Sequence, residues 1–361
     1  MENILISKTP IPSSLIGSWN NLLTQLLVKR PNFFEYIISP RTKNKIKNIN
    51  IESQEYYLDK FYAKYYKKEY SKKKFWRPLE KILIKKPDTK FNVIIFDDAQ
   101  IALAVDYFSK KQKIRNRIKI IFFLRGFDFS VNIEKRNKIY ATFDKLVVQT
   151  KSSYLHQVAT NHTIPCEVFI LPNGIDNSLF YKVDIDVKNE LRNKYQLPTF
   201  KRYFLWVSQD RPKKGLSIIL KAWEELIKSY DDIELIIVGT DKPIKGGNIK
   251  WFEKRSNSKL PNFYQLTDYY LFSSLCHEGH SLSLTEALKS GAKCLVSDIA
   301  PNSEVLADSK YGYLIENPHN VESWVNAMKN VLEGQMIFNE FDSKDIYCMD
   351  DWIHNFTKIL N

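Results

Sequence analysis

Cysteine and long apolar runs are scarce in this chain of 361 residues, and each scarcity excludes a class of protein. The four cysteines lie far apart, form no CxxC pair and have no histidine at ligand spacing. This pattern argues against a disulfide scaffold or a zinc site and favours cysteines that act as small buried hydrophobes. No stretch of about 18 uncharged apolar residues occurs, so we expect no membrane span.

The glycine-rich loops that hold phosphates in many enzymes are also lacking. The sequence has neither a GxxxxGK motif nor a GxGxxG motif after an expected strand. Phosphoryl transfer and dinucleotide oxidoreduction therefore lack their usual loops. Asp184 and Asp186 have the form of a metal-binding DxD pair, but they precede a helical stretch and are expected to cap it. We expect no catalytic metal and no cofactor.

The first residues, MENILISKTPIP, do not fit a secretory signal. Glu2 stands ahead of a very short apolar run, whereas a signal peptide needs a basic start and a longer apolar core. We therefore expect a cytoplasmic protein, and a peripheral position on the inner face of the plasma membrane stays open.

The net charge of +13 is unevenly distributed. Residues 1–170 hold 31 Lys and Arg against 15 Asp and Glu, whereas residues 171–361 hold 23 against 26. A basic half indicates an anionic partner such as a membrane surface, an acidic acceptor or nucleic acid. A lysine-rich genome would give the same excess without any partner. The basic, aromatic residues 56–86 allow three interpretations: membrane headgroup contact, nucleic-acid contact, or one or two helices with aromatic side chains inward.

Short apolar runs alternate with longer amphipathic stretches, which predicts a parallel α/β sheet in each half of the chain. Expected strands cover residues 3–6, 34–39, 92–96, 119–124, 145–149, 168–171, 203–208, 234–238, 269–273 and 294–297. Expected helices cover residues 20–28, 101–110, 216–229, 282–290, 321–332 and 350–360.

The turn LPNGID, residues 171–176, separates the two series of strands and is a natural hinge. We expect two facing Rossmann-like, doubly wound α/β domains, residues 1–172 and 173–345, with a cleft between them. Residues 346–361 form a C-terminal helix that can pack back on the first domain. In such sheets ligands bind at the carboxyl ends of the strands, so the loops that follow the strands are expected to carry the chemistry.

The segment HEGHSLSLTEALKSG, residues 277–291, is the strongest candidate for a site. Glu278 and Glu286 are eight residues apart, the first just ahead of an apolar helix and the second inside it. Both acids can therefore face one ligand. The backbone N–H groups of residues 279–282 would stand at the helix N-terminus, which suits a pyrophosphate or sugar oxygens. On the spacing alone, a capping glutamate and a surface glutamate are the simpler interpretation.

The wider segment SLCHEGHSLSLTEALKSGAKCLVSD, residues 274–298, resembles the signature of the retaining GT-B glycosyltransferases of family four. Residues 203–226, YFLWVSQDRPKKGLSIILKAWEEL, are similar to that family's strand, basic loop ending in Lys-Gly, and helix. The segments ELIIVGT and LPNGID resemble its next strand and its interdomain turn. Four segments in the right order make a specific match, whereas the first half resembles the family only loosely.

The resemblance implies roles for three residues. Glu278 would contact hydroxyls of the donor sugar, Glu286 would bind the nucleotide ribose through its 2′ and 3′ hydroxyls, and Lys214 would neutralise the diphosphate. A fixed cation at the leaving diphosphate stabilises the transition state more than the ground state. Further donor-binding candidates, each of which also has a purely structural interpretation, are Gly279, His280, Ser281, Leu282, Gly239 and Asn173.

Two departures from the family concern the phosphate contacts. The family usually has an arginine near the end of the strand before the basic loop, where this chain has Ser208 and Gln209. Arg211 or Lys213 can substitute for it, or both are solvated loop charges. The family's glycine doublet after the first strand is reduced to one glycine, Gly17, which we expect to let the backbone approach the donor phosphates.

A third departure lies in the first half. The family often has a His-Gly after the strand of residues 119–124, and this chain has Arg125 and Gly126 there. Arg125 cannot act as a base, but it can bind a phosphate or an acceptor carboxylate with two hydrogen bonds. Its other interpretation is a loop arginine paired with Asp128. We count it with Glu278 and Lys214 as a catalytic candidate.

We therefore expect a retaining hexosyltransferase that moves a sugar from a UDP- or GDP-sugar to a hydroxyl of a glycan or lipid-linked glycan, in the biosynthesis of a surface polysaccharide such as lipopolysaccharide. The first domain would take the acceptor and the second the donor. Two alternatives remain. One is a nucleotide-sugar epimerase of the same fold, and the other is a basic nucleic-acid-binding protein, although no recognised nucleic-acid motif occurs.

Overall fold

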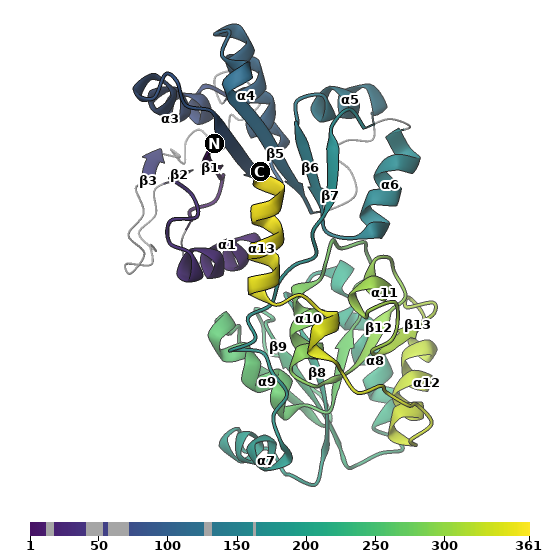
Figure 1. The fold of residues 1–361 in the computed structure, drawn as a ribbon. Coiled ribbons are helices and arrows are strands. Elements are labelled where there is room, and N and C mark those ends of the chain that lie inside the picture. The colour runs from purple at the N-terminus through teal and green to yellow at the C-terminus, as the bar shows by residue number, and fades with distance from the viewer. Residues whose placement is uncertain (12–17, 41–52, 57–71, 126–131, 162–163) are drawn as a thin grey trace. The chain divides into compact units, whose positions relative to one another are not determined.

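The computed structural model describes residues 1–11, 18–40, 53–56, 72–125, 132–161 and 164–361. The chain divides into two compact units (Figure 1). Unit 1 comprises Met1–Pro172 and Met349–Asn361, and unit 2 comprises Asn173–Cys348. The last helix of the chain therefore belongs to unit 1.

Among the described residues, a seven-stranded parallel sheet organises unit 1, in the order β3-β2-β1-β4-β5-β6-β7. Its strands are β1 (Glu2–Ile6), β2 (Tyr36–Pro40), β3 (Ser53–Tyr56), β4 (Phe91–Phe96), β5 (Ile118–Leu124), β6 (Lys145–Val148) and β7 (Glu167–Ile170). Strand β1 pairs with both β2 and β4. The strand order therefore reverses between β1 and β4, which is where such sheets bind ligands.

The helices in the described part of unit 1 bury their apolar faces on this sheet. They are α1 (Ser18–Lys29), α3 (Lys72–Lys85), α4 (Ala99–Lys111), α5 (Ile133–Tyr140), α6 (Lys151–Asn161) and α13 (Met349–Leu360). Helix α13 lies beside α1 (Figure 1), and its Phe356 ring packs 4.9 Å from that of Phe123. Asn92 Nδ2 and Lys145 Nζ donate to carbonyl oxygens of its last turn. These bonds satisfy acceptors that a helix end leaves without a partner of its own.

In the described part of unit 2, six parallel strands follow the order β10-β9-β8-β11-β12-β13. Their bounds are β8 (Arg202–Val207), β9 (Ile233–Val238), β10 (Ile249–Phe252), β11 (Tyr269–Phe272), β12 (Lys293–Ser297) and β13 (Tyr313–Ile315). Strand β8 pairs with β9 on one side and with β11 on the other. The strand order of this sheet therefore reverses between β8 and β11.

Alternate residues of each strand in unit 2 enter two separate cores, one on each face of the sheet. Leu205 and Tyr270 pack in a core with side chains of α7 (Ile185–Lys194), α9 (Leu260–Leu266) and α10 (Leu282–Lys289). Phe204 and Leu271 pack on the other face with α8 (Leu216–Leu226) and α12 (Val321–Leu332). A sheet buried on both faces explains why its strands are continuous apolar runs in the sequence.

The expected fold class, two doubly wound parallel α/β domains, is confirmed. All expected strands are present, with ends displaced by at most two residues. Strands β3, β10 and β13 were not predicted, and all three are edge strands of three or four residues. An edge strand is less buried and carries a weaker apolar signal. Of the helical stretch expected at 56–86, the structure describes α3, whereas residues 57–71 lie outside the described part.

The expected role of Asp184 as a helix cap is confirmed, because its carboxylate accepts a hydrogen bond from Val187 N at 2.9 Å at the start of α7. Of the helices that the structure describes, none combines the length and the apolar character needed to cross a membrane.

Candidate functional site

The predicted donor-site residues of unit 2 lie at the carboxyl ends of three adjacent strands. Lys214 belongs to a short 3₁₀ turn, Pro212–Lys214, that follows β8. Gly239 follows β9, and Glu278 lies in the loop between β11 and α10. The first and third of these loops follow the two strands between which the strand order reverses. This is the position at which doubly wound sheets bind ligands.

A set of hydrogen bonds fastens the loop after β8 to the loop after β11. Trp206 Nε1 donates to Ser273 Oγ at 3.0 Å, and Ser273 Oγ donates to the carbonyl oxygen of Lys214 at 2.9 Å. Leu275 N donates to the carbonyl oxygen of Lys213 at 2.8 Å. We call this arrangement the clasp. It fixes the backbone on both sides of Lys214 and so limits where its amine can reach.

Gly215 allows the two loops of the clasp to approach so closely. It has a φ of 71°, in the left-handed region, and a Cβ at this position would overlap with the carbonyl oxygen of Ser273. A residue with a side chain would therefore be strained twice, by its backbone angle and by the contact. The Lys-Gly pair of the sequence is thus a structural requirement of the clasp.

Lys214 and Glu278 meet although they are 64 residues apart in the chain. Lys214 Nζ forms an ion pair and hydrogen bond with Glu278 Oε1, and Ser274 Oγ donates to the same oxygen at 2.6 Å. Both charged side chains are 21% exposed. The second oxygen, Oε2, makes no hydrogen bond with the part of the chain that the structure describes. A partly exposed carboxylate oxygen of this kind can accept hydroxyl hydrogen bonds from a ligand.

Glu286 lies on α10 and is almost completely buried. Burial raises the pKa of its carboxyl from 4.5 to about 7, and a hydrogen bond from Tyr264 opposes this rise. The Tyr264 hydroxyl donates to Glu286 Oε2 at 3.2 Å. The carboxyl of Glu286 therefore changes its protonation near neutral pH, which is unusual for a glutamate and common at functional sites.

The two acids lie near one buried residue of β11. Tyr270 is fully buried, and burial is the largest cause of its raised pKa. The negative charges of Glu286 and Glu278 raise the same pKa further. The structure thus brings Lys214 and Glu278 into direct contact, whereas Glu286 lies on α10 and contacts Tyr264; that all three residues bind one donor stays a prediction.

The loop that leads into α10 is held by Asn173, which the sequence suggested as a donor contact. Asn173 is buried, and its Nδ2 donates to the carbonyl oxygen of His280 at 2.8 Å. Burial lowers the pKa of His280 to about 4, so this imidazole is neutral at pH 7. Gly279 is buried, Ser281 is the N-cap residue of α10, and Leu282 is its first residue. These residues place the loop and the helix N-terminus beside Glu278.

The other predicted residues of unit 2 take different positions. Arg211 and Lys213 are exposed on the loop that carries Lys214. Gly239 has a φ of 104°, and a Cβ there would lie 2.6 Å from the carbonyl oxygen of Ser208. Its glycine is therefore explained by the close approach of the chain segments that follow β8 and β9.

The predicted residues of the first half belong to unit 1. Arg125 follows β5, and its Nη2 lies 3.5 Å from Asp97 Oδ2. Asp97 follows β4 with a φ of 55°, which is uncommon for a residue other than glycine. Burial raises the pKa of Asp97, and the charge of Arg125 opposes the rise. Gly17 and the other candidate partner, Asp128, lie outside the described residues.

Two supporting residues of the site were missed by the sequence analysis. Ser274 stands four residues before Glu278, within the motif, so its proximity to that acid could have been inferred. Tyr264 belongs to α9, a helix of seven residues that carries no motif. Nothing in the sequence marks its contact with Glu286.

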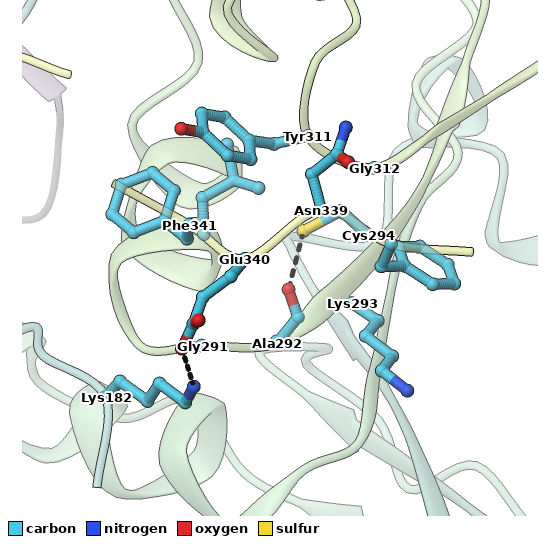
Figure 2. Close-up of a pocket in the computed structure, with 12 residues that line it drawn as sticks. Lys182, Gly291, Ala292, Lys293, Cys294, Tyr311, Gly312, Asn339, Glu340 and Phe341 are labelled. Carbon is cyan, nitrogen blue, oxygen red and sulfur yellow. Dashed lines mark hydrogen bonds and ion pairs between the residues drawn. The ribbon is translucent and has the colours of Figure 1, made fainter. Parts of the chain in front are cut away.

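A hollow of about 250 Å³ in unit 2 is separate from this site (Figure 2). It is lined by residues that precede or begin β12 and β13, among them Cys294 and Gly312, and by the segment 338–341. Figure 2 shows the ion pair between Lys182 and Glu340 at this hollow. Parallel strands have their amino ends at one edge of the sheet and their carboxyl ends at the other, so the hollow and the clasp are at opposite edges. Among the described residues, no group of three or more His, Cys, Asp or Glu side chains could hold a metal ion.

Residues 187–344 match the sequence profile of the family described as "Glycosyl transferases group 1". The match covers most of unit 2 and includes Lys214, Glu278 and Glu286.

Curated relatives match about half of the chain. A lipopolysaccharide 1,2-N-acetylglucosaminetransferase of Salmonella typhimurium is 22% identical over 183 residues, which are 46% of this chain and 47% of the relative. A UDP-Gal:alpha-D-GlcNAc-diphosphoundecaprenol alpha-1,3-galactosyltransferase of Escherichia coli is 25% identical over 188 residues, which are 48% of this chain and 47% of the relative. The chain thus spans about half the length of the curated relatives it matches.

Similarity of fold extends over the whole chain. The crystal structure of Anabaena Alr3699/HepE in complex with UDP and glucose matches with a TM-score of 0.75 at 13% identity, covering 100% of this chain and 99% of that one. At this identity the likeness concerns the fold alone. Residues 187–344 are therefore similar to the glycosyl transferases group 1, and the chain as a whole has the GT-B fold of two Rossmann-like domains.

Proposed function

We propose that this protein is a retaining glycosyltransferase that moves a hexose or a related sugar from a UDP- or GDP-sugar to a hydroxyl of a glycan or lipid-linked glycan. The observation that carries the proposal is the meeting of Lys214 and Glu278 at the carboxyl ends of the strands where the order reverses. The similarity of residues 187–344 to the glycosyl transferases group 1 supports it. The named activities of the relatives support an acceptor in surface polysaccharide biosynthesis.

Lys214 has the chemistry that a leaving diphosphate needs. Its ammonium group has three N–H donors, of which one is directed to Glu278. The remaining donors can bind phosphate oxygens while the pair with Glu278 persists. Negative charge develops on the diphosphate as the sugar–phosphate bond breaks, and a cation held in place by the clasp stabilises that charge without reorganisation.

In this proposal, Glu278 and Glu286 bind hydroxyl groups at opposite ends of the donor. Glu278 accepts hydrogen bonds from the sugar, and Glu286 accepts them from the ribose. Lys214 and Ser274 both hold Oε1 of Glu278, which suits hydroxyl binding better than covalent attack on the sugar. We therefore propose that the acceptor hydroxyl attacks on the face that the diphosphate leaves, with a departing phosphate oxygen taking its proton. The configuration at the anomeric carbon is then retained.

The kind of acceptor is proposed from the net charge of the first half of the chain. Residues 1–170 carry an excess of 16 positive charges, which favours an acceptor that is anionic or presented on an anionic membrane surface. Sedimentation with acidic vesicles, at low and at high salt, checks this assignment. Equal binding to acidic and neutral vesicles would contradict it.

The proposed activity is tested by a panel of nucleotide sugars in a thermal-shift measurement. A donor binds the folded state and raises the melting temperature, by an amount that corresponds to about 2.7 kcal/mol at a hundredfold excess over Kd. Glu286→Gln should abolish the shift, because the amide loses acceptor capacity at the ribose. Glu224→Gln, the same change at an exposed residue of α8, is the matched control and should leave the shift intact.

Product analysis separates the proposed reaction from epimerisation. A transferase releases nucleoside diphosphate when an acceptor is present, whereas an epimerase converts the donor to a new nucleotide sugar without any acceptor. A panel that produces no thermal shift, or a shift that survives Glu286→Gln, would reject the assignment of this site.

A further inference from the structure

Tyr264 lies outside the sequence motifs of the site but contacts one of its two acids. It belongs to α9, which packs on the same face of the unit 2 sheet as α10. Its hydroxyl donates to Glu286 Oε2 at 3.2 Å. The contact joins two helices, because Glu286 stands on α10, 22 residues further along the chain.

The position of the Tyr264 hydroxyl is fixed by the core. Tyr264 is completely buried, and its ring packs edge-on against Tyr270 at 5.5 Å and against Phe180 at 6.0 Å between centroids. A ring confined in this way cannot follow the movements of a neighbouring carboxylate. The hydroxyl therefore acts as a fixed point, and the Glu286 carboxylate is oriented by it.

The hydrogen bond leaves most of the carboxylate available. Each carboxylate oxygen accepts up to two hydrogen bonds. Tyr264 uses one position on Oε2, and Oε1 makes no hydrogen bond with any other residue in the described ranges. A ribose has two adjacent hydroxyl groups that can donate hydrogen bonds. These two donors match the two acceptor oxygens of a carboxylate whose orientation is fixed.

We propose that Tyr264 is a positioning residue for nucleotide binding, whose hydroxyl orients the Glu286 carboxylate to accept hydrogen bonds from the ribose diol of a nucleoside diphosphate. This inference rests on the proposed function, which assigns Glu286 to the ribose.

Nucleotide affinity should depend on pH if Glu286 binds the ribose. The ionised carboxylate accepts from both ribose hydroxyls, so nucleotide affinity should increase as the pH rises through the pKa of Glu286, which burial has raised to about 7. The hydrogen bond from Tyr264 lowers this pKa, so its removal should move the midpoint to higher pH. The ionisable groups facing Glu286 are Tyr264 of α9 and Tyr270 of β11. On α10 itself, Lys289 Nζ is bonded to Asn177 Oδ1.

The first arm of the test needs no nucleotide. The pKa of Glu286 is measured by carbon-13 NMR of labelled glutamate carboxyls in the full chain, with Glu286→Gln to assign the signal. Tyr264→Phe should raise this pKa by about one unit, because the variant loses a hydrogen bond that stabilises the ionised carboxylate. Tyr203→Phe is the matched control, because Tyr203 is equally buried in the same core and its hydroxyl donates to the carbonyl oxygen of Pro198.

The second arm measures UDP and GDP binding by calorimetry between pH 5.5 and 9. Tyr264→Phe should weaken binding about tenfold at pH 7 and move the midpoint of the pH profile upward by the same amount as the NMR titration. Part of the affinity should return at pH 9, where the carboxylate is ionised in both proteins. A loss of fold would instead weaken binding at every pH.

Two negative results have different meanings. If the wild type binds UDP or GDP but Tyr264→Phe behaves like Tyr203→Phe in both arms, the positioning role is overturned and the proposed function stands. If the wild type binds neither nucleotide, the proposed function fails and the inference with it.

Discussion

The carboxyl-terminal edges of the two sheets are built differently. In unit 2, the loops after β8 and β11 are joined by the clasp, and Lys214 and Glu278 meet where each is mostly covered. In unit 1, two ion pairs of more exposed cations lie at this edge, Arg125 with Asp97 at 3.5 Å and Lys8 with Asp98 at 3.4 Å, and the backbone N–H of Arg125 also donates to Asp97 Oδ1 at 3.5 Å. Arg125 is 49% exposed and Lys8 is 56% exposed.

Local contacts therefore restrict the geometry of the charged groups more strongly in unit 2 than in unit 1. An exposed ion pair contributes about 0–1 kcal/mol and can exchange partners readily. A pair held by backbone hydrogen bonds and a required glycine keeps one geometry. This contrast agrees with the sequence comparisons, since the family profile covers residues 187–344 in unit 2. Under the proposed function, such a contrast is expected if relatives share donors, bound by unit 2, and differ in acceptors, bound by unit 1.

The largest expected effect is that of Lys214→Ala. Without the cation, the negative charge of the leaving diphosphate loses its fixed partner, and we expect turnover to fall about a thousandfold, as for the removal of other preorganised groups at developing charge. Binding of the intact nucleotide sugar, measured without acceptor, should weaken less, because its diphosphate carries less negative charge than the departing nucleoside diphosphate. Release of nucleoside diphosphate in the presence of acceptor measures the first effect, and calorimetry measures the second.

Lys221→Ala is the matched control for this prediction, because Lys221 is an exposed lysine of unit 2 on α8. It should leave both quantities unchanged. If Lys214→Ala retained turnover within threefold of the wild type, the contrast between a fixed donor side and a variable acceptor side would lose its main support.

The clasp itself is tested by a pair of glycine substitutions. Gly215 and Gly334 have almost the same backbone angle, with φ of 71° and 72°. A Cβ at Gly215 would overlap with Ser273, whereas a Cβ at Gly334 would meet no atom within 4 Å. Gly334→Ala should cost about 1–2 kcal/mol of unfolding free energy for the backbone angle alone. Gly215→Ala should cost about 2 kcal/mol more, since the clasp must open, as for other overpacked positions.

Urea unfolding of the two variants measures the difference. Equal losses of stability would mean that the loops of the clasp separate without penalty. The close approach of Gly215 and Ser273 would then be no constraint on the position of Lys214.

Most of the fold could be predicted from periodicity, and several of the elements that were not predicted are short. The helix expected at residues 321–332 has those bounds in the structure, because its apolar positions repeat at helical spacing over three turns. The strand β13 was missed because it has three residues and lies at an edge. Helix α9 was missed because its seven residues, LPNFYQL, are too short for a periodic pattern. Short elements are defined by their neighbours, and single-sequence patterns do not contain this information.

The site could be predicted only in part, because some of its contacts depend on how separate elements pack against one another. The spacing of Glu278 and Glu286 is visible in the sequence, but the proximity of Glu278 to Lys214 was expected only from a resemblance to a family. The bond between Tyr264 and Glu286 could not be expected at all, since it joins two helices whose packing depends on the whole core. The role of Arg125 is still a prediction, because nothing in the described structure tests it.

The smallest expected effect is that of substituting Arg125. It tests whether the carboxyl-terminal edge of the unit 1 sheet serves the acceptor, as the proposed function expects. A guanidinium paired with Asp97 at 3.5 Å retains donors for an anionic acceptor. Arg125→Ala should therefore raise the KM for the acceptor about tenfold, equivalent to about 1.4 kcal/mol, and leave UDP or GDP affinity unchanged. Arg125→Lys should fall between, since it keeps the charge and loses the planar pair of donors. Lys111→Ala, at an exposed lysine of α4, controls for the change in net charge. A loss of nucleotide affinity in Arg125→Ala would instead favour the other expectation for Arg125, a contact with a donor phosphate, because a residue that serves only the acceptor has no effect on nucleotide binding.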